Sequence, residues 1–328
     1  MKRRTFLAAA VSAVASRGAT PVRRRVETVL GPVDPERLGT TLIHEHVLVD
    51  FIGADRASAS RYNADEVFGA ALPKLKDLYS TGCRTLVECT PAFLGRDPQL
   101  LRRLAKASGL HIVTNTGYYG ANKDRHVPKF AYSETAAALA QRWTAEYKQG
   151  IGGIKPGFMK VGVDAGPLSE IDAKLISAGC FCHKSTGLRL HVHTGNGEAA
   201  LGILELMGKH DVPARAYVWV HAQSEKNRSV HVQAAKAGAW LEFDGINPRR
   251  LDEHVNAVVE LIELGHLSQL LMSHDSGWYR VGEPGGGQFN GYTYLFEAFL
   301  PQLRKRGVTD AQIRTLLTEN PARVLTWQ

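Results

Sequence analysis

The sequence has few cysteines and no long apolar run, and both absences narrow the classes of protein to which it can belong. Only four of its 328 residues are cysteine, and Cys83, Cys89, Cys180 and Cys182 lack the paired spacing of a cysteine zinc site. We therefore expect buried thiols, although an oxidising compartment would permit a disulfide. The N-terminal apolar run, residues 7–15, is too short to span a bilayer, so no stable membrane anchor is predicted.

The chain also lacks a concentrated basic patch, although its formal net charge is +8. The basic run Arg23-Arg24-Arg25 has no interleaved aromatic residues, and the chain contains no nucleic-acid motif. The excess charge therefore indicates solubility, and no nucleic-acid partner is expected. A hydrophobic content of 44% and a charged content of 22% are ordinary for a globular protein, which excludes disordered and fibrous classes.

The first 15 residues resemble a twin-arginine export signal. Lys2-Arg3-Arg4 precede Thr5-Phe6-Leu7 and the short apolar run, and small residues at Ala13 and Ala15 fit an Ala-x-Ala cleavage site. The resemblance implies export to the periplasm or the extracellular space. The cleavage boundary could extend to about residue 20.

Short apolar β-type runs alternate with longer amphipathic stretches through the rest of the chain. The predicted strands are residues 41–49, 85–90, 111–116, 157–163, 188–194, 216–222, 239–246 and 269–275. The predicted helices are residues 66–80, 97–108, 133–149, 168–186, 197–209, 226–237, 252–264, 294–306 and 309–319. Eight strand-helix alternations without a dividing linker predict a single (β/α)8 TIM barrel over residues 26–328.

The first predicted strand contains His44-Glu45-His46. Residues two apart on a strand point to the same face, so His44 and His46 project together and are suited to binding a divalent metal. Two packed histidines on a strand are the alternative, and the motif alone is too short to exclude it. A metal site therefore requires further ligands elsewhere in the chain.

Candidate ligands recur where the predicted strands end, which is where barrel enzymes place their chemistry. They are His44 and His46 on the first strand, Lys160 on the fourth, His193 on the fifth, His221 on the sixth and Asp275 on the eighth. Six candidates on five strands are much harder to obtain by accident than one His-x-His. The glycine-rich loop at residues 282–287 follows the eighth strand, lacks the Lys-Ser/Thr of a P-loop, and is interpreted as a mobile lid or substrate-side loop.

This constellation resembles the phosphotriesterase family of the amidohydrolase superfamily through nearly the whole mature chain. The motifs that carry the resemblance are Gly-Thr-Thr-Leu-Ile-His-Glu-His at 39–46, Gly-Arg-Asp at 95–97, Gly-Phe-Met-Lys-Val-Gly-Val-Asp at 157–164, His-Val-His-Thr-Gly at 191–195, Leu-Glu-Phe-Asp at 241–244, Ser-His-Asp at 273–275 and Glu-Asn-Pro-Ala-Arg-Val-Leu at 319–325. The series is specific to that family.

The resemblance implies two divalent metal ions, with zinc expected first, although imidazole and carboxylate ligands also accept cobalt, manganese or iron. His44, His46 and Asp275 would hold a buried ion, His193 and His221 a more exposed one, and Lys160, carboxylated on its amine, would bridge them. Lys155 is the competing bridge, but it precedes Pro156, whereas Lys160 lies inside the apolar run. A hydroxide shared by the ions would attack the substrate, with Asp275 taking its proton.

Four other ionisable residues are assigned supporting or structural roles. We expect His191 to be a core or supporting histidine deeper in the barrel, His274 to be structural, and Glu45 to point away from its neighbours towards a helix. Glu88 is interpreted either as a buried support for the site or as an ordinary core carboxylate.

Substrate contacts are predicted from loops, because loops set specificity on this fold. Tyr118 and Tyr119, with Trp278 and Tyr279, are candidates for an aromatic wall, each with rim packing as the alternative; Asp244, which matches a family aspartate, is a further candidate contact. Gly245 departs from the histidine or arginine of related enzymes. The prediction is hydrolysis of a small-molecule ester, of the phosphotriester (aryldialkylphosphatase) type, with a lactonase or carboxylesterase as the alternative and a non-catalytic binding barrel as a more distant one. Family members are often dimers, so a homodimer is possible.

Overall fold

The computed structural model describes residues 25–326. The predicted export signal lies outside these residues and stays a prediction. Within the described residues, no helix combines the length and apolar character needed to cross a membrane. Cys83, Cys89, Cys180 and Cys182 are all buried free thiols, as the sequence predicts.

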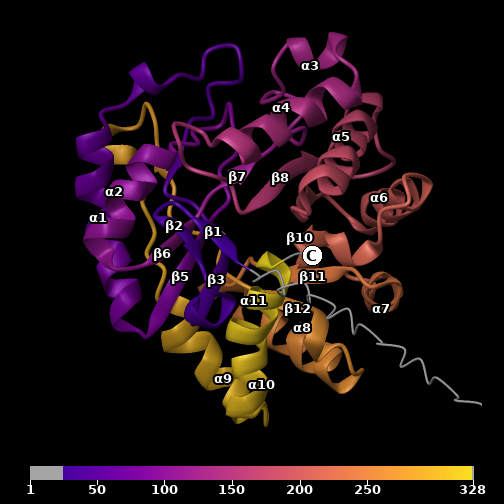
Figure 1. Ribbon diagram of the computed structural model, residues 1–328. Helices are drawn as coiled ribbons and strands as arrows, with labels where there is room; N and C mark the ends of the chain where they lie inside the picture. The colour runs from indigo at the N-terminus through magenta and orange to yellow at the C-terminus, as the bar shows by residue number, and fades with distance from the viewer. Residues whose placement is uncertain (1–24, 327–328) are drawn as a thin grey trace, which may run out of the picture.

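Parallel strands form the wall of a barrel (Figure 1). They are β3 (Thr40–Glu45), β5 (Cys83–Glu88), β6 (His111–Val113) continued by β7 (Asn115–Thr116), β8 (Phe158–Val163), β9 (Leu190–Thr194), β10 (Tyr217–Val220), β11 (Trp240–Phe243) and β12 (Leu270–Met272). Each strand pairs in parallel with the next one along the chain. The ring closes where the Asp275 amide donates to the His44 carbonyl and the His46 amide donates to the Ser276 carbonyl, at 3.2 and 2.9 Å. The chain therefore forms the predicted (β/α)8 barrel.

Helices surround the strands (Figure 1). They are α1 (Ala64–Ser80), α2 (Pro98–Ser108), α3 (Phe130–Ser133), α4 (Ala136–Gln149), α5 (Glu170–Thr186), α6 (Gly197–Lys209), α7 (Arg228–Ala237), α8 (Leu251–Glu263), α9 (Leu300–Lys305), α10 (Asp310–Arg314) and α11 (Asn320–Leu325). Two predicted helices contain π-helical turns in the structure. The turn at Leu295–Phe299 precedes α9, and the turn at Thr315–Glu319 follows α10. The helix predicted from residue 133 begins later, because the Thr135 hydroxyl caps it by accepting from the Ala138 amide.

Two small two-stranded units lie outside the barrel wall. β1 (Val26–Thr28) pairs with β2 (Gly31–Val33) before the first barrel strand, and β4 (Leu48–Val49) pairs with β13 (Tyr279–Arg280). The second pair joins the segment after β3 to the segment after β12. It therefore ties together the two loops that carry His46 and Asp275.

Burial on both faces explains why the barrel strands are almost continuously apolar. The β8 strand, Phe-Met-Lys-Val-Gly-Val, is buried at every position. Phe158 packs in an apolar cluster with Val87, Val218 and Leu271, which α11 covers through Val324. Since side chains alternate along a strand, Lys160 shares the face of Phe158 and lies two residues nearer the carboxyl end.

Candidate metal centre

His44 and His46 meet at the carboxyl end of β3. Their Nε2 atoms are 3.3 Å apart, and both side chains are buried, with 1% and 4% of the residue exposed. The pairing of β3 with β5 shifts register between Leu42 and Glu45, immediately around these residues. The predicted pair is therefore present, and its partners decide whether it is a ligand pair or ordinary packing.

The surroundings of His44 fix which of its ring nitrogens is free to bind. Its Nδ1 lies 2.8 Å from Glu242 Oε1 and 2.8 Å from Asp244 Oδ2, so we assign the proton to Nδ1. Burial, with the nearby positive charge of Lys160, lowers the pKa of His44 to about 4, so the ring is neutral. The Nε2 lone pair is consequently available for a cation.

His46 is held in the same tautomer by a hydroxyl relay. Its Nδ1 donates to Thr90 Oγ1 at 2.7 Å, and the Thr90 hydroxyl in turn donates to Glu88. Glu88 also accepts from the Val47 amide at 3.2 Å. Glu88 thus lies in the supporting position, the first of its two interpretations, and His46 Nε2 also presents a lone pair.

Asp275 completes the buried cluster from the segment after β12. Its φ of 55° places it in the left-handed region, which turns the side chain towards the histidines. Its Oδ1 lies 3.1 Å from His46 Nε2 and 3.7 Å from His44 Nε2, and this buried atom has no hydrogen-bond partner among residues 25–326. Burial would raise the pKa of Asp275, but His44 and His46 lower it below its usual range.

These three atoms are acceptors without a proton between them. Two imidazole lone pairs and a carboxylate oxygen would repel one another in a buried site unless a cation lay among them. The Lys160 amine lies 3.1 Å from one of the three, His44 Nε2, and a divalent ion among them would neutralise all three. Nitrogen and oxygen donors in this number suit zinc and related divalent ions. The residues therefore fit a divalent metal, and His44, His46 and Asp275 are the ligands that would hold it.

Lys160 lies beside this cluster on β8. Its Nζ is 3.1 Å from His44 Nε2, and only 2% of the residue is exposed. The β8 and β9 strands pair Lys160 with His191 and Gly162 with His193. Lys160 therefore lies within reach of the buried histidine pair, whereas Lys155 lies on the exposed side and places its amine over the Tyr147 ring.

His193 and His221 form an outer pair. Their ring centroids are 4.4 Å apart with an interplanar angle of 81°. His193 Nδ1 lies 3.0 Å from the Tyr119 hydroxyl, and His221 Nδ1 donates to Asp244 Oδ1 at 2.6 Å. Burial lowers the pKa of His193, with the charge of His221 adding to it, while for His221 the Asp244 carboxylate outweighs burial and raises the pKa.

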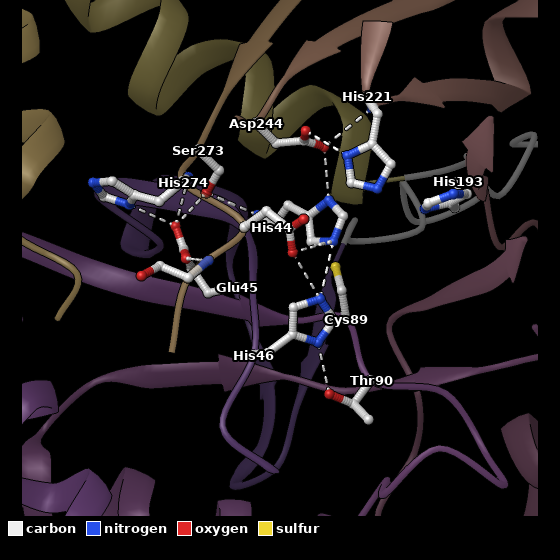
Figure 2. A network of polar contacts seen from close by, with 12 residues as sticks. His44, Glu45, His46, Cys89, Thr90, His193, His221, Asp244, Ser273 and His274 are labelled. Carbon is white, nitrogen blue, oxygen red and sulfur yellow. Dashed lines mark hydrogen bonds and ion pairs between the residues drawn. The ribbon is translucent and has the colours of Figure 1, made fainter. Parts of the chain in front are cut away.

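Asp244 differs from its predicted place among the substrate contacts. It is completely buried behind the histidines and accepts from His44 and His221 (Figure 2). It also accepts from the Gln223 side-chain amide. The His44–Asp244 and His221–Asp244 distances of 2.8 and 2.6 Å are hydrogen-bond lengths, so these groups support the ligands rather than form a further metal site. The prediction missed this because strand alternation places Glu242 and Asp244 on one face but does not show which groups they meet.

The predicted aromatic wall is only partly present. The Trp278 ring lies 4.4 Å from that of His46 and stacks on Phe51 at 5.6 Å, and Tyr119 contacts His193. Tyr118 instead packs against Trp143 of α4, 5.3 Å between centroids, so its assignment as a substrate contact is wrong. Successive residues point to opposite sides of the wall, so only one of Tyr118 and Tyr119 can face the metal centre.

The structure also places the remaining residues to which a role was assigned. Tyr279 is buried against the glycine-rich loop: a Cβ added at Gly286 would approach its ring to 2.3 Å. His191 lies deep in the barrel, 3.8 Å from Glu242, and His274 accepts from the Leu295 amide. Glu45 faces residues 273–276 rather than a helix, so its predicted helix contact is wrong.

Fold and site together define a class: a (β/α)8 barrel with a cluster of histidines and carboxylates, suited to binding metal ions, at the carboxyl ends of its strands. More specifically, the chain belongs to the Phosphotriesterase family, whose sequence model matches residues 24–325. Members of this family are hydrolases with a binuclear metal centre.

Relatives of several activities match nearly the whole chain. A phosphotriesterase homology protein of Escherichia coli is 28% identical, covering 87% of this chain and 97% of its own. An aryldialkylphosphatase of Saccharolobus solfataricus is 25% identical, covering 88% and 95%, and an N-acetyltaurine hydrolase of Salmo salar is 25% identical, covering 93% and 98%. The structure of an organophosphorus hydrolase from Deinococcus radiodurans superposes with a TM-score of 0.82 at 25% identity, covering 94% of this chain and 100% of that one.

Proposed function

We propose that the protein is a binuclear metal-dependent hydrolase that cleaves ester bonds, with phosphotriesters as its first substrate class. The observation that carries the proposal is the meeting of His44 Nε2, His46 Nε2 and Asp275 Oδ1 as buried acceptors with no proton among them. His193 and His221 would hold a second ion, and Lys160, whose Nζ lies 3.1 Å from His44 Nε2, would be the bridging ligand.

Two divalent ions, when bound, lower the pKa of a water shared between them and polarise the bond under attack. The chain supplies the remaining functions. The Nδ1 partners of His44, His46 and His221 hold these rings with Nε2 turned towards the ions. Asp275 would accept the proton of the attacking water, since His44 and His46 keep its pKa below the usual range despite burial.

Lys160 requires a chemical change before it can act as a ligand. Its neutral amine would form a bond with the carbon of carbon dioxide and release one proton, which gives an anionic carbamate with two oxygens. Burial supports this product, because a free ammonium between two cations would be strongly disfavoured. Mass spectrometry of the native protein should therefore find the mass of one added carbon dioxide on Lys160, lost on acidification.

The side chains that approach the ligand histidines from the loops are aromatic, which favours an apolar substituent. Trp278 contacts the His46 ring and continues to Phe51, which is 40% exposed, and Tyr119 contacts His193. Lactones are the second candidate, favoured by the similarity to a solved structure described as engineered for organophosphate hydrolysis from a weak promiscuous lactonase template, with a TM-score of 0.81.

A substrate panel on metal-loaded protein tests the proposal. We expect measurable kcat/KM on aryl phosphotriesters that is lost on chelation and recovered when zinc or cobalt is added. Efficient lactone opening beside negligible phosphotriester turnover would show that the protein is a lactonase. Preferential cleavage of N-acyl amides would indicate an activity like that of the N-acetyltaurine hydrolases. Full metal occupancy with no hydrolysis of any of these compounds would overturn the proposal.

A further inference from the structure

Glu45 is the residue between the two histidine ligands, and its carboxylate collects donors from the segment around Asp275 (Figure 2). Its Oε1 accepts from the Ser273 hydroxyl, the His274 amide and His274 Nδ1 at 2.7, 2.9 and 2.7 Å. Its Oε2 accepts from the Ser276 amide at 2.8 Å. The side chain is fully buried. One carboxylate therefore holds residues on both sides of Asp275.

The same two segments are joined by their backbones. The Asp275 amide donates to the His44 carbonyl, the His46 amide donates to the Ser276 carbonyl, and the His44 amide donates to Ser273 Oγ at 3.0 Å. His44 and His46 thus sit on one side of a hydrogen-bonded junction and Asp275 on the other. Glu45 provides the side chain that fixes their separation.

We propose that Glu45 is a positioning residue for the buried metal, setting the geometry of all three of its ligands although it touches none of the reacting atoms. This inference rests on the proposed function, because it assumes that His44, His46 and Asp275 bind a metal. Metal ligands must lie within a few tenths of an ångström of their ideal distances, so a small shift of residues 273–276 weakens the site. Hydrogen bonds to a buried charged acceptor are stronger than neutral ones, which suits Glu45 to resist that shift.

Replacing Glu45 by glutamine tests the role with little change of volume. An amide has one acceptor oxygen, so in either orientation its NH2 group faces a donor, at Ser276 or at Ser273 and His274. The buried donors beside Asp275 then lose their partner, whereas the metal ligands themselves are unchanged. Asp172→Asn is the matched control, because Asp172 is a buried carboxylate on α5 that hydrogen-bonds with Ser169.

The experiment compares metal binding by the metal-free full-length proteins. We expect Glu45→Gln to lower the affinity for the first equivalent of zinc by about 10–100-fold and to alter the visible spectrum of the cobalt-substituted protein. The increase in Tm on adding zinc should shrink in the same variant. Asp172→Asn should keep the zinc affinity, the cobalt spectrum and the metal-induced increase in Tm, whatever its effect on the stability of the metal-free protein.

Ser273→Ala provides a second variant if Glu45→Gln does not fold. It removes one donor to Glu45 and the acceptor of the His44 amide, so we expect a several-fold loss of affinity in the same direction. If the wild type binds two equivalents of zinc and the variants keep its affinity and spectrum, the role of Glu45 is overturned and the proposed function stands. An equal loss in Asp172→Asn would do the same. A wild type that binds no zinc or cobalt would overturn the proposed function and, with it, this inference.

Discussion

The two halves of the metal centre differ in what lies behind their ligands. In the buried half, Glu242 and Asp244 stand behind His44, a Thr90–Glu88 relay stands behind His46, and Glu45 holds the residues beside Asp275. In the outer half, the His221 ring also hydrogen-bonds to Asp244, and the His193 ring hydrogen-bonds to the Tyr119 hydroxyl. The side chain of His44 is 1% exposed and that of His221 is 13% exposed.

This difference indicates that the buried half is preorganised and that the outer half is adjustable at His193. A carboxylate, acting directly or through Thr90, orients His44, His46 and His221, whereas the single neutral hydroxyl of Tyr119 leaves the His193 ring more freedom. Two residues connect the halves. Lys160 would bridge the two ions, and Asp244 hydrogen-bonds to His44 in one half and to His221 in the other. Substitutions can therefore be ranked by whether they affect both halves or only one.

The largest effect is expected from Lys160→Ala. Loss of a bridging ligand should reduce both metal equivalents and lower kcat/KM by more than the roughly 10–100-fold that an outlying partner costs. Metal content by elemental analysis and turnover of the best substrate measure this. Lys155→Ala is the control, since Lys155 is exposed and should leave both readouts unchanged. Unaltered metal content in Lys160→Ala would exclude Lys160 as the bridge.

A smaller loss, still in both halves, is expected from Asp244→Asn. Asp244 accepts from His44 Nδ1 and His221 Nδ1, and asparagine would remove the negative charge behind both rings and leave an acceptor oxygen for only one of them. We expect the affinity for each metal equivalent to fall about 10–100-fold, measured by competition with a chelator. A loss confined to one equivalent would show that Asp244 does not couple the halves.

The sequence predicts the barrel and the meeting of the ligands because both follow from short-range regularities. Strand-helix alternation specifies the fold, and parallel strands bring their carboxyl ends to one rim, so His44, His193 and Asp275 can be placed together without coordinates. The same regularity explains why Tyr118 and Tyr119 cannot both face the site. Which of these adjacent tyrosines packs against the helices depends on strand phase, which the sequence does not show.

The supporting residues are harder to predict because they depend on contacts between distant segments. Glu45 and Ser273 are 228 residues apart in the chain, and no local pattern links them. Thr90 offered a weak signal, since it ends a predicted strand two residues after Glu88, on the same face. Glu45 shows that a polar residue next to the ligands can support the site even when strand alternation turns its side chain away from them.

A matched pair of substitutions compares the halves directly. Thr90→Val, which keeps the side-chain shape, removes the acceptor of His46 Nδ1 and should weaken the first equivalent by about tenfold. Tyr119→Phe removes the hydroxyl beside His193 and should weaken the second equivalent by about fivefold, as expected for roughly 1 kcal/mol from a neutral hydrogen bond. Stepwise zinc titration followed by calorimetry resolves the two. The distinction between halves fails if either variant weakens both equivalents alike.

The smallest effect is expected at Gly245, which adjoins the residue shared by both halves. A Cβ there would lie 2.8 Å from Gln223 Nε2 and 3.2 Å from His254 Nε2. Gln223 donates to Asp244 Oδ1 at 2.7 Å, the same oxygen that accepts from His221. Gly245→Ala should therefore displace Gln223 and weaken the outer equivalent by about two- to fivefold, the scale of one hydrogen bond. The affinity for the buried equivalent should be retained, because Asp244 Oδ2 and Glu242 still face His44.

Gln223→Ala provides the comparison, because it removes the same donor without adding a Cβ. If the two variants agree in stepwise zinc titration, the displaced hydrogen bond accounts for the effect; a loss in Gly245→Ala alone would place its cause in the contact with His254, and a loss at the buried equivalent would contradict the division of the site into two halves.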